Sequence, residues 1–210
     1  MADQSIDGRM PLRNEPVQAR STARLATLLD AAAAVVNDIG YELLTTAMVA
    51  ERANASIGTV YRYFPDRIAL LQALGSRNLE RVLGRVMDEI FDEMHEDINA
   101  TVAAAFEVFV EACRTEPGFR SLRLGDVIDL RPPAKERTYN SVVADRMLDG
   151  LISRFGVEDS PALRFQFEIA IEVSDALAAR AFSRDSNGDE AFLGARRDLL
   201  TTMLADALSS

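Results

Sequence analysis

The sequence holds only one cysteine and one histidine among its 210 residues, and this scarcity excludes several kinds of chemistry. A single Cys cannot form a disulfide within one chain, so a reducing compartment such as the cytoplasm is expected. A single His cannot build a His-rich metal site, and the chain has neither a CxxC pair nor a glycine-rich phosphate loop. We therefore predict no metal site, no cofactor and no enzymatic activity.

Long apolar runs and strand patterns are missing as well. No run approaches the length needed to cross a bilayer, and the first ten residues, MADQSIDGRM, lack the apolar stretch of a signal peptide. No stretch sustains an alternation of period two, so no β-sheet is expected. With 48% hydrophobic residues the chain can fill the core of one large domain or two small ones. The prediction is a soluble, all-α protein without membrane contact.

Basic charge is also scarce. The formal net charge of −10 argues at first sight against a nucleic-acid partner. The first 70 residues, however, hold seven arginines against eight carboxylates, a net charge of −1, which leaves −9 for the remainder. The acidity therefore belongs to the second part of the chain, which need not face DNA. Few phosphate contacts per monomer and a moderate salt dependence are expected.

The most informative stretch consists of two short helical patterns on either side of Asn54-Ala55-Ser56. The first spans Thr46–Ala53, and the second spans Ser56–Phe64. In the second, Val60 and Phe64 form a narrow apolar seam four residues apart. The side chains left outside this seam are those of Ile57, Thr59, Tyr61, Arg62 and Tyr63. A helix that spends so little of its surface on a core is suited to being presented to a partner.

Capping residues at both helices indicate a helix–turn–helix. Thr45 and Ser56 are suitable N-caps, because their hydroxyls can accept from unpaired backbone N–H groups. Asn54 tolerates the left-handed backbone of a sharp helix exit. Pro65 ends the second helix, and Asp66 can cap a third. Two short helices joined by a turn of about three residues are typical of DNA-binding proteins that place the second helix in the major groove.

The seven residues Gly58–Phe64, GTVYRYF, followed by the basic Arg67, are the most specific signal in the chain. With them the sequence resembles the TetR-type bacterial transcriptional regulators. Three positions depart from that family's usual pattern. Asn54 stands where the family usually has Gly, Ile57 where a polar or basic residue is common, and Ile68 where an acidic residue is common. The other matching residues are Thr45, Thr46, Val49, Ala50, Ala53, Ser56, Leu70 and Leu71, and the close resemblance covers roughly residues 21–75.

The resemblance implies a set of DNA-binding residues, and their chemistry agrees with that role. Arg62 can read a guanine edge or bind phosphate, and Arg67 lies in the first helical turn that follows. Ile57 can pack on a thymine methyl or into the core. The alternative is a surface helix with incidental aromatics. The predicted DNA-binding residues are Thr46, Ser56, Ile57, Gly58, Thr59, Tyr61, Arg62, Tyr63 and Arg67.

The N-terminal part divides into an arm and a DNA-binding domain. Residues 1–20 show no period and are predicted to be a disordered arm, whose Arg9, Arg13 and Arg20 could alternatively reach a minor groove. A first helix, Thr22–Ile39, is expected to supply the core of the DNA-binding domain, residues 21–68. The next helix begins at Asp66 and continues without a linker into the second part.

Residues 69–210 are predicted to form a helical domain for ligand binding and dimerisation. Its five further helices are expected at Ile98–Thr115, Phe119–Ile128, Ala134–Phe155, Pro161–Ser183 and Asp189–Leu208. The last two are apolar over more than one stripe, which favours a two-fold four-helix interface over a simply thicker core. The predicted dimer residues are Ile169, Val173, Ala176, Leu177, Leu200, Met203 and Leu204.

The resemblance also implies an effector cavity in this second domain. Soft apolar side chains are candidates to line it, although each could equally be ordinary core, and a polar residue in an apolar helix could instead form a salt bridge or face solvent. The predicted ligand-binding residues are Met87, Phe91, Met94, Phe106, Phe109, Tyr139, Met147 and Glu172. His95 is expected to be exposed and Cys113 to be a small core residue.

Together these patterns and the family resemblance predict an all-α protein with an N-terminal three-helix, helix–turn–helix DNA-binding unit and a larger helical-bundle effector-binding and dimerisation domain. The predicted function is a ligand-responsive repressor that binds a near-palindromic double-stranded DNA operator as a homodimer and is released by a small apolar effector. The alternative is an effector-binding or enzymatic helical bundle whose helix–turn–helix is only structural.

Overall fold

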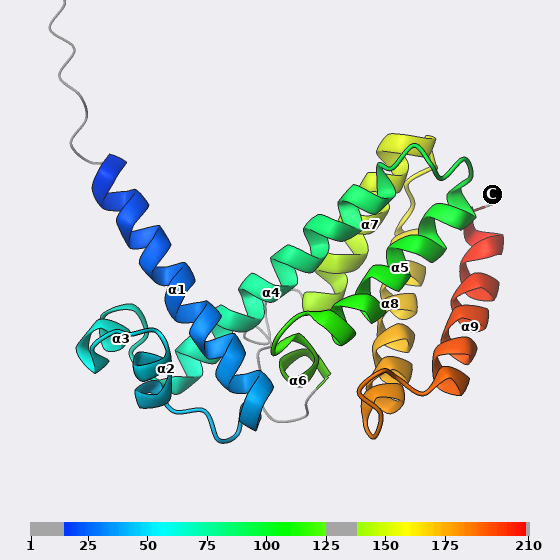
Figure 1. The fold of residues 1–210 in the computed structure, drawn as a ribbon. Helices are drawn as coiled ribbons and strands as arrows, with labels where there is room; N and C mark the ends of the chain where they lie inside the picture. Colours follow the sequence, from blue (N-terminus) through cyan, green and yellow to red (C-terminus); the bar gives the residue numbers. More distant parts are fainter. Residues whose placement is uncertain (1–14, 125–137, 209–210) are drawn as a thin grey trace, which may run out of the picture.

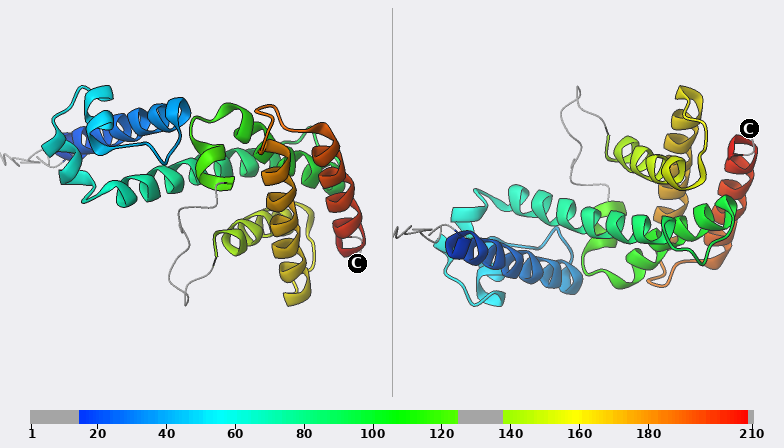
Figure 2. Two further views of the ribbon diagram at one scale, coloured as in Figure 1. Left: turned by 90° about the horizontal axis from the view of Figure 1, so that it is seen from below. Right: turned by 90° about the horizontal axis from the view of Figure 1, so that it is seen from above.

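The computed structural model describes residues 15–124 and 138–208, and within these ranges the chain forms nine α-helices and no strand (Figure 1). The predicted all-α class is confirmed. The molecule is elongated, with α1–α3 at one end, α8 and α9 at the other, and α4 running between them (Figure 2). The helices are α1 (Glu15–Ile39), α2 (Thr46–Arg52), α3 (Ile57–Tyr63), α4 (Arg67–Ile90), α5 (Ile98–Thr115), α6 (Phe119–Leu124), α7 (Tyr139–Phe155), α8 (Pro161–Phe182) and α9 (Glu190–Leu208).

The ends of α2 and α3 form as their capping residues predict. The side chains of Thr45, Ser56 and Asp66 each accept a hydrogen bond from the backbone N–H three residues further on. Asn54 adopts the left-handed conformation with a φ of 47°, which an Asn tolerates better than most residues. This residue lets the chain leave α2 and enter α3 within a few residues.

The two short helices depend on a core that other helices supply. A seven-residue helix is unstable alone in water, because its few backbone hydrogen bonds do not offset the free-energy cost of starting a helix. Val60 of α3 is fully buried and adds about 1.5–3 kcal/mol of apolar burial. The rest of this N-terminal core comes mostly from α1 and α4, and its members larger than alanine are Leu28, Leu29, Val35, Val36, Tyr41, Leu44, Val49, Phe64, Leu70, Leu71, Leu74 and Leu122.

The helix α4 belongs to both halves of the molecule, as its unbroken apolar period predicts. Leu71 and Leu74 in its first half are part of the N-terminal core. Val86 and Ile90 in its second half are part of a separate core built with α5, α7, α8 and α9. A tilt of this one helix therefore moves buried groups in both cores.

A fully buried arginine ties three helices of the second core together. Arg196 of α9 donates from Nε to the Ser174 hydroxyl at 2.9 Å and from a terminal nitrogen to the Phe106 carbonyl at 2.7 Å. Its other terminal nitrogen lies 3.1 Å from a Glu107 carboxylate oxygen. Burying a guanidinium is tolerable here because each of its nitrogens has a partner.

One expected boundary is revised by the structure. Residues 15–20, predicted to be part of a disordered arm, form the first turns of α1. Pro16 is compatible with a first helical turn, which does not use its missing N–H, and Gln18, Ala19 and Arg20 are good helix formers. Residues 1–14, including Arg9 and Arg13, lie outside the described residues, as do the predicted helical residues 125–128 and 134–137. Within the described ranges, no helix combines the length and apolar content that crossing a membrane requires.

We expect Arg196→Met to lower the free energy of unfolding by about 2–4 kcal/mol, because it leaves Ser174 and the Phe106 carbonyl without their donor. Arg197→Met is the matched control, since Arg197 is exposed and pairs with Glu107 and Glu190 at the surface. Its expected cost is below about 1 kcal/mol. Urea denaturation of both variants measures the difference. Equal losses would contradict the stabilising role of the buried hydrogen bonds.

Candidate nucleic-acid interface and effector cavity

The helix α3 turns most of its side chains to solvent. Tyr61 is 52% exposed and Ile57 is 43% exposed, which rules out the alternative that Ile57 packs into the core. Ser56, Gly58 and Arg62 are exposed, and Thr59 and Tyr63 are half-buried. Helix α3 lies at one end of the molecule, and each of its predicted DNA-binding residues is exposed or half-buried (Figure 1).

The start of α3 is held by its own cap. The Ser56 hydroxyl accepts from the Thr59 N–H at 3.1 Å and lies 2.9 Å from the Thr59 hydroxyl. A Cβ placed on Gly58 would meet only the Ser56 hydroxyl, at 3.8 Å. The backbone at Gly58 is thus uncovered, so a phosphate can approach it closely.

The start of α2 meets the middle of α3 through a side-chain hydrogen bond. The half-buried Thr46 hydroxyl donates to the Tyr61 hydroxyl at 3.3 Å. This contact places two predicted DNA-binding residues side by side on adjacent helices.

Near its N-terminus, α1 adds residues to this face that the sequence analysis did not assign. Ser21 lies beside Tyr63, with the two hydroxyls 3.2 Å apart. That hydrogen bond, followed by Arg62 and Arg24, lowers the pKa of the Tyr63 phenol below its ordinary value, although burial opposes the shift. The Arg62 guanidinium lies 5.2 Å from the Tyr63 ring centroid. Because α1 begins at Glu15 and not at the predicted Thr22, Arg20 and Arg24 both lie in it, four residues apart on one side. A prediction that started the helix earlier would have included this basic pair.

Arg67 has a structural role in addition to its predicted phosphate contact. Its guanidinium donates to the Glu42 carbonyl at 2.7 Å and to the Tyr41 carbonyl at 3.2 Å. These bonds fasten the connection between α1 and α2 onto the first turn of α4. A loss of DNA binding in an Arg67 variant would therefore combine two effects.

A small cavity of about 30 Å³ lies inside the second core. Three predicted ligand residues, Phe106, Phe109 and Met147, line it. Its other lining residues are Val82, Leu83, Val86, Ala105, Arg123, Val143, Ile171, Ser174 and Asp175. The cavity therefore draws its walls from α4, α5, α6, α7 and α8.

The remaining ligand predictions are not brought into this cavity. Phe91 and Met94 lie at the end of α4 and in the turn after it, where Met94 is 83% exposed. Glu172 is exposed on α8, so none of these three residues lines the cavity. The helical spacing of these residues indicated that they share a helix face. It did not indicate whether that face packs against another helix or faces solvent. Met87 is half-buried against Gly150 of α7, and the side chain of Tyr139 lies outside the described residues.

One corner of the cavity is polar. A terminal nitrogen of Arg123 binds the Asp175 carboxylate and also lies 2.5 Å from the Asn140 side-chain oxygen. Burial raises the pKa of the Asp175 carboxyl above its ordinary value, and the Arg123 guanidinium acts in the opposite direction. Burial also raises the pKa of the nearby Cys113 thiol to about 12, so that thiol stays protonated at neutral pH.

The predicted dimer residues divide between surface and core. Ile169 and Ala176 are exposed on one face of α8, and Val173 and Leu177 beside them are half-buried. Met203 of α9 is half-buried as well. Leu200 and Leu204 are buried in the second core, so their assignment to the interface is corrected. Their face of α9 is the one that packs on the molecule's own α5 and α8.

An exposed aromatic extends the α8 face beyond the predicted residues. Phe165 is 63% exposed and precedes Ile169 by one helical turn. Leu199 is exposed on the neighbouring α9. We call the residues Phe165, Ile169, Val173, Ala176 and Leu199 the α8–α9 face.

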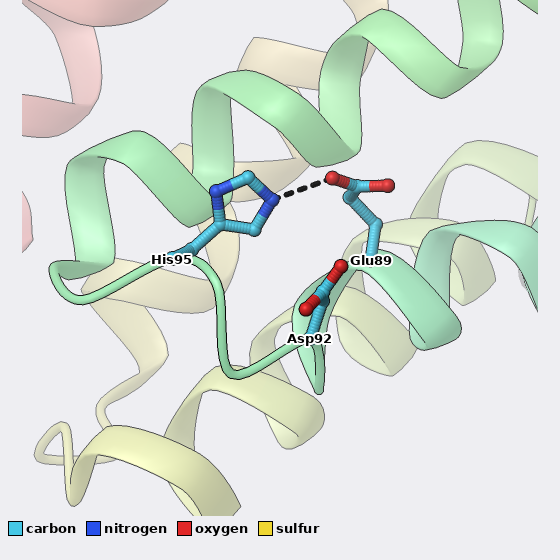
Figure 3. Close-up of side chains that lie close together, drawn as sticks. All are labelled: Glu89, Asp92 and His95. Atoms are coloured by element: carbon cyan, nitrogen blue, oxygen red, sulfur yellow. Dashed lines mark hydrogen bonds and ion pairs between the residues drawn. The ribbon is translucent and has the colours of Figure 1, made fainter.

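A histidine–carboxylate cluster lies at the end of α4 (Figure 3). Donor atoms of Glu89, Asp92 and His95 lie within 4.8 Å of one another, a grouping that the predicted absence of metal-ligand spacing overlooked. His95 is half-buried instead of exposed, because its Nε2 bonds to the Glu89 carboxylate at 2.5 Å. Arg154 of α7 fixes the same turn by donating to the carbonyls of Ile90 and His95. These hydrogen bonds hold the turn after α4 in place.

An exposed helix–turn–helix carried on a helical bundle defines a DNA-binding regulator. The chain belongs to the TetR family. The family description "Bacterial regulatory proteins, tetR family" matches residues 28–74, and "Tetracyclin repressor-like, C-terminal domain" matches residues 96–208. Because proteins of this family are DNA-binding regulators, the prediction that the chain is not an enzyme is confirmed.

Individual relatives agree with this assignment. The transcriptional repressor KstR of Mycolicibacterium smegmatis is 42% identical over 59 residues, 28% of this chain and 29% of KstR, so the match spans under a third of that relative's length. A TetR-family regulator from Streptomyces coelicolor is 32% identical, covering 90% of this chain and 99% of that chain with a TM-score of 0.75. A TetR variant from Acinetobacter baumannii, solved with minocycline, is 20% identical over 86% of this chain and 94% of that chain, with a TM-score of 0.57, and shows the fold alone.

We expect Arg67→Ala to lower Tm by about 3–6 °C, because two carbonyls lose a charged donor worth about 1–2 kcal/mol in total. Tyr61→Ala is the comparison, with a Tm change of about 1 °C or less, because Tyr61 is largely exposed. Differential scanning calorimetry measures both variants. An unchanged Tm for Arg67→Ala would show that its side chain is free to serve DNA alone.

Proposed function

We propose that this regulator is a homodimeric repressor that binds a near-palindromic operator and releases it when a small apolar effector enters the cavity of the second core. The observation that carries the proposal is the exposed face of α3, where Tyr61, Arg62 and Ile57 are presented while only Val60 is fully buried. A helix of this kind offers a bidentate guanidinium and a methyl-contacting side chain to base edges of the major groove.

Two copies of α3 give the specificity that one short helix lacks. The α8–α9 face is apolar and exposed at the end of the molecule opposite α3 (Figure 2). Pairing of this face around a two-fold axis would leave both recognition helices free. Two half-sites about 34–36 Å apart, one turn of DNA, would then receive them.

The cavity and the DNA-binding unit share structural elements, which supports coupling between them. Val82 and Val86 of α4 line the cavity, and the first turns of α4 are part of the N-terminal core. In α6, Leu122 packs in the N-terminal core while the next residue, Arg123, lines the cavity. An effector that binds one arrangement of α4 and α6 better than another shifts the equilibrium toward that arrangement, by as much as its two affinities differ. The spacing of the recognition helices would change with that equilibrium.

The direct test is the affinity of the protein for the DNA fragment that it retrieves from its own genome. We expect Arg62→Ala to weaken binding about tenfold or more, since a bidentate base contact contributes about 1–3 kcal/mol. Arg146→Ala removes an equal charge on α7, far from α3, and pairs at the surface with Glu80. Its affinity is expected to stay within about twofold of the wild type. Gel shifts at matched salt that show equal affinities for all three proteins would remove α3 as the reading helix.

The dimer has a separate test. We expect the double variant Phe165→Glu, Ile169→Glu to elute as a monomer of 23.1 kDa, because four buried carboxylates would face one another across the interface. Light scattering after size-exclusion chromatography measures the mass, and the wild type is expected at twice that value. Phe91→Glu is the control, since Phe91 is exposed outside this face. A double variant that stays dimeric would place the interface elsewhere.

A further inference from the structure

We propose that the effector is an electrically neutral, mainly apolar molecule with one hydrogen-bond acceptor oxygen, and that the Nε–H of Arg123 donates to that oxygen. The proposal rests on the proposed function in one respect, namely that the cavity of the second core is the effector site. It adds the chemical class of the ligand and the residue that selects it.

The apolar character of the ligand follows from the cavity wall. Nine of the twelve lining residues have hydrocarbon, aromatic or thioether side chains, and only Arg123, Ser174 and Asp175 are polar. The Ser174 hydroxyl accepts from Arg196, so one of its acceptor positions is already occupied. A ligand in this space therefore buries hydrocarbon over most of its surface, and one corner of the wall is left to recognise a polar group.

The acceptor oxygen follows from the hydrogen bonds of Arg123. One terminal nitrogen of its guanidinium serves both Asp175 and Asn140. Its Nε, in contrast, is buried and has no hydrogen-bond partner among the described residues. A buried donor without a partner destabilises the empty protein, and an incoming carbonyl, ether or hydroxyl oxygen removes that penalty. A hydrocarbon of the same size gains nothing from the corner.

The neutrality of the ligand follows from the charges around the corner. The Arg123 guanidinium is paired with the Asp175 carboxylate, so the corner carries no net charge. Of the other ionisable groups in the second core, Arg196 is paired with Glu107, and Cys113 is a protonated thiol because burial raises its pKa to about 12. An anionic ligand would compete with Asp175 for the Arg123 guanidinium, and a cationic ligand would be repelled by that guanidinium. Both would bring an unbalanced charge into an apolar space, at high cost.

The cavity must widen to receive such a molecule, and two of its side chains can allow this. A volume of about 30 Å³ has room for one or two water molecules. Met147 is a flexible thioether that can change rotamer, and Phe109 is only half-buried. The Phe109 ring lies 5.8 Å from the Arg123 guanidinium and 5.6 Å from the Phe119 ring, so its movement is felt at the polar corner and along α6.

Four probes of similar size test the proposal on the full-length protein. They are acetophenone, which is neutral with an acceptor oxygen; ethylbenzene, which is neutral without one; benzoate, an anion; and benzylamine, a cation. Protein labelled with carbon-13 at its methionine methyls reports binding through the Met147 signal, which Met147→Leu identifies by its disappearance. We expect acetophenone to bind with a Kd at least about tenfold lower than that of each other probe.

The variant Arg123→Lys identifies the donor. It keeps a positive charge for Asp175 but has no Nε–H at that position, so the acetophenone Kd is expected to rise about tenfold while the ethylbenzene Kd stays within about twofold. The wild-type ranking stands as an independent test if this variant does not fold. Tighter binding of benzoate or benzylamine than of acetophenone, or equal binding of acetophenone and ethylbenzene, would overturn the neutral-acceptor class.

The outcomes separate this inference from the proposed function. Binding of all four probes without preference keeps the effector cavity and removes only the ligand class. A Met147 signal that no probe shifts, up to saturation of the probe in water, would overturn both the ligand class and the use of this cavity. Gel shifts on the same protein then show independently whether it binds DNA as a regulator.

Discussion

The fold of the DNA-binding unit depends on one constraint: α2 and α3, with seven residues each, cannot bury enough apolar surface to be stable alone. They are stabilised by α1 and α4, whose leucines supply most of the N-terminal core. This support lets α3 commit only Val60 fully to the interior and present the rest of its side chains. If α3 had to provide its own core, the exposed tyrosine and arginine side chains would give way to apolar ones, and no reading face would remain.

The same constraint makes α4 the mechanical centre of the molecule. Its first half is locked into the N-terminal core by Leu71 and Leu74, and its second half lines the cavity through Val82 and Val86. Because α4 and α6 both line the cavity, a ligand that widens it beyond what Met147 and Phe109 allow can shift either helix as a body. Neutrality at the Arg123–Asp175 corner then matters for regulation as well as for recognition, since a ligand that broke this ion pair would remove one of the contacts between α6 and α8.

The local structure of the DNA-binding unit could be predicted from its sequence, whereas much of the second domain could not. Caps and turns are decided by neighbouring residues, so Thr45, Asn54 and Ser56 were sufficient to define the helix–turn–helix. Helical period identifies an apolar face but not what covers it, which is why Leu200 and Leu204 were assigned to the dimer and lie in the core. The cavity corner joins α6, α7 and α8 through residues far apart in the chain. No local pattern marks Arg123 as the donor of that corner.

The central claim is that the exposed face of α3 enters the major groove at two sites one turn apart. Protection of guanine N7 from dimethyl sulfate on a retrieved operator fragment tests it most directly, because N7 lies in the major groove. We expect two protected patches whose centres are about 10 base pairs apart, or a multiple of one helical turn, and we expect both to be lost with Arg62→Ala. Full reactivity of N7 beneath the bound protein, with protection confined to the minor groove, would contradict it.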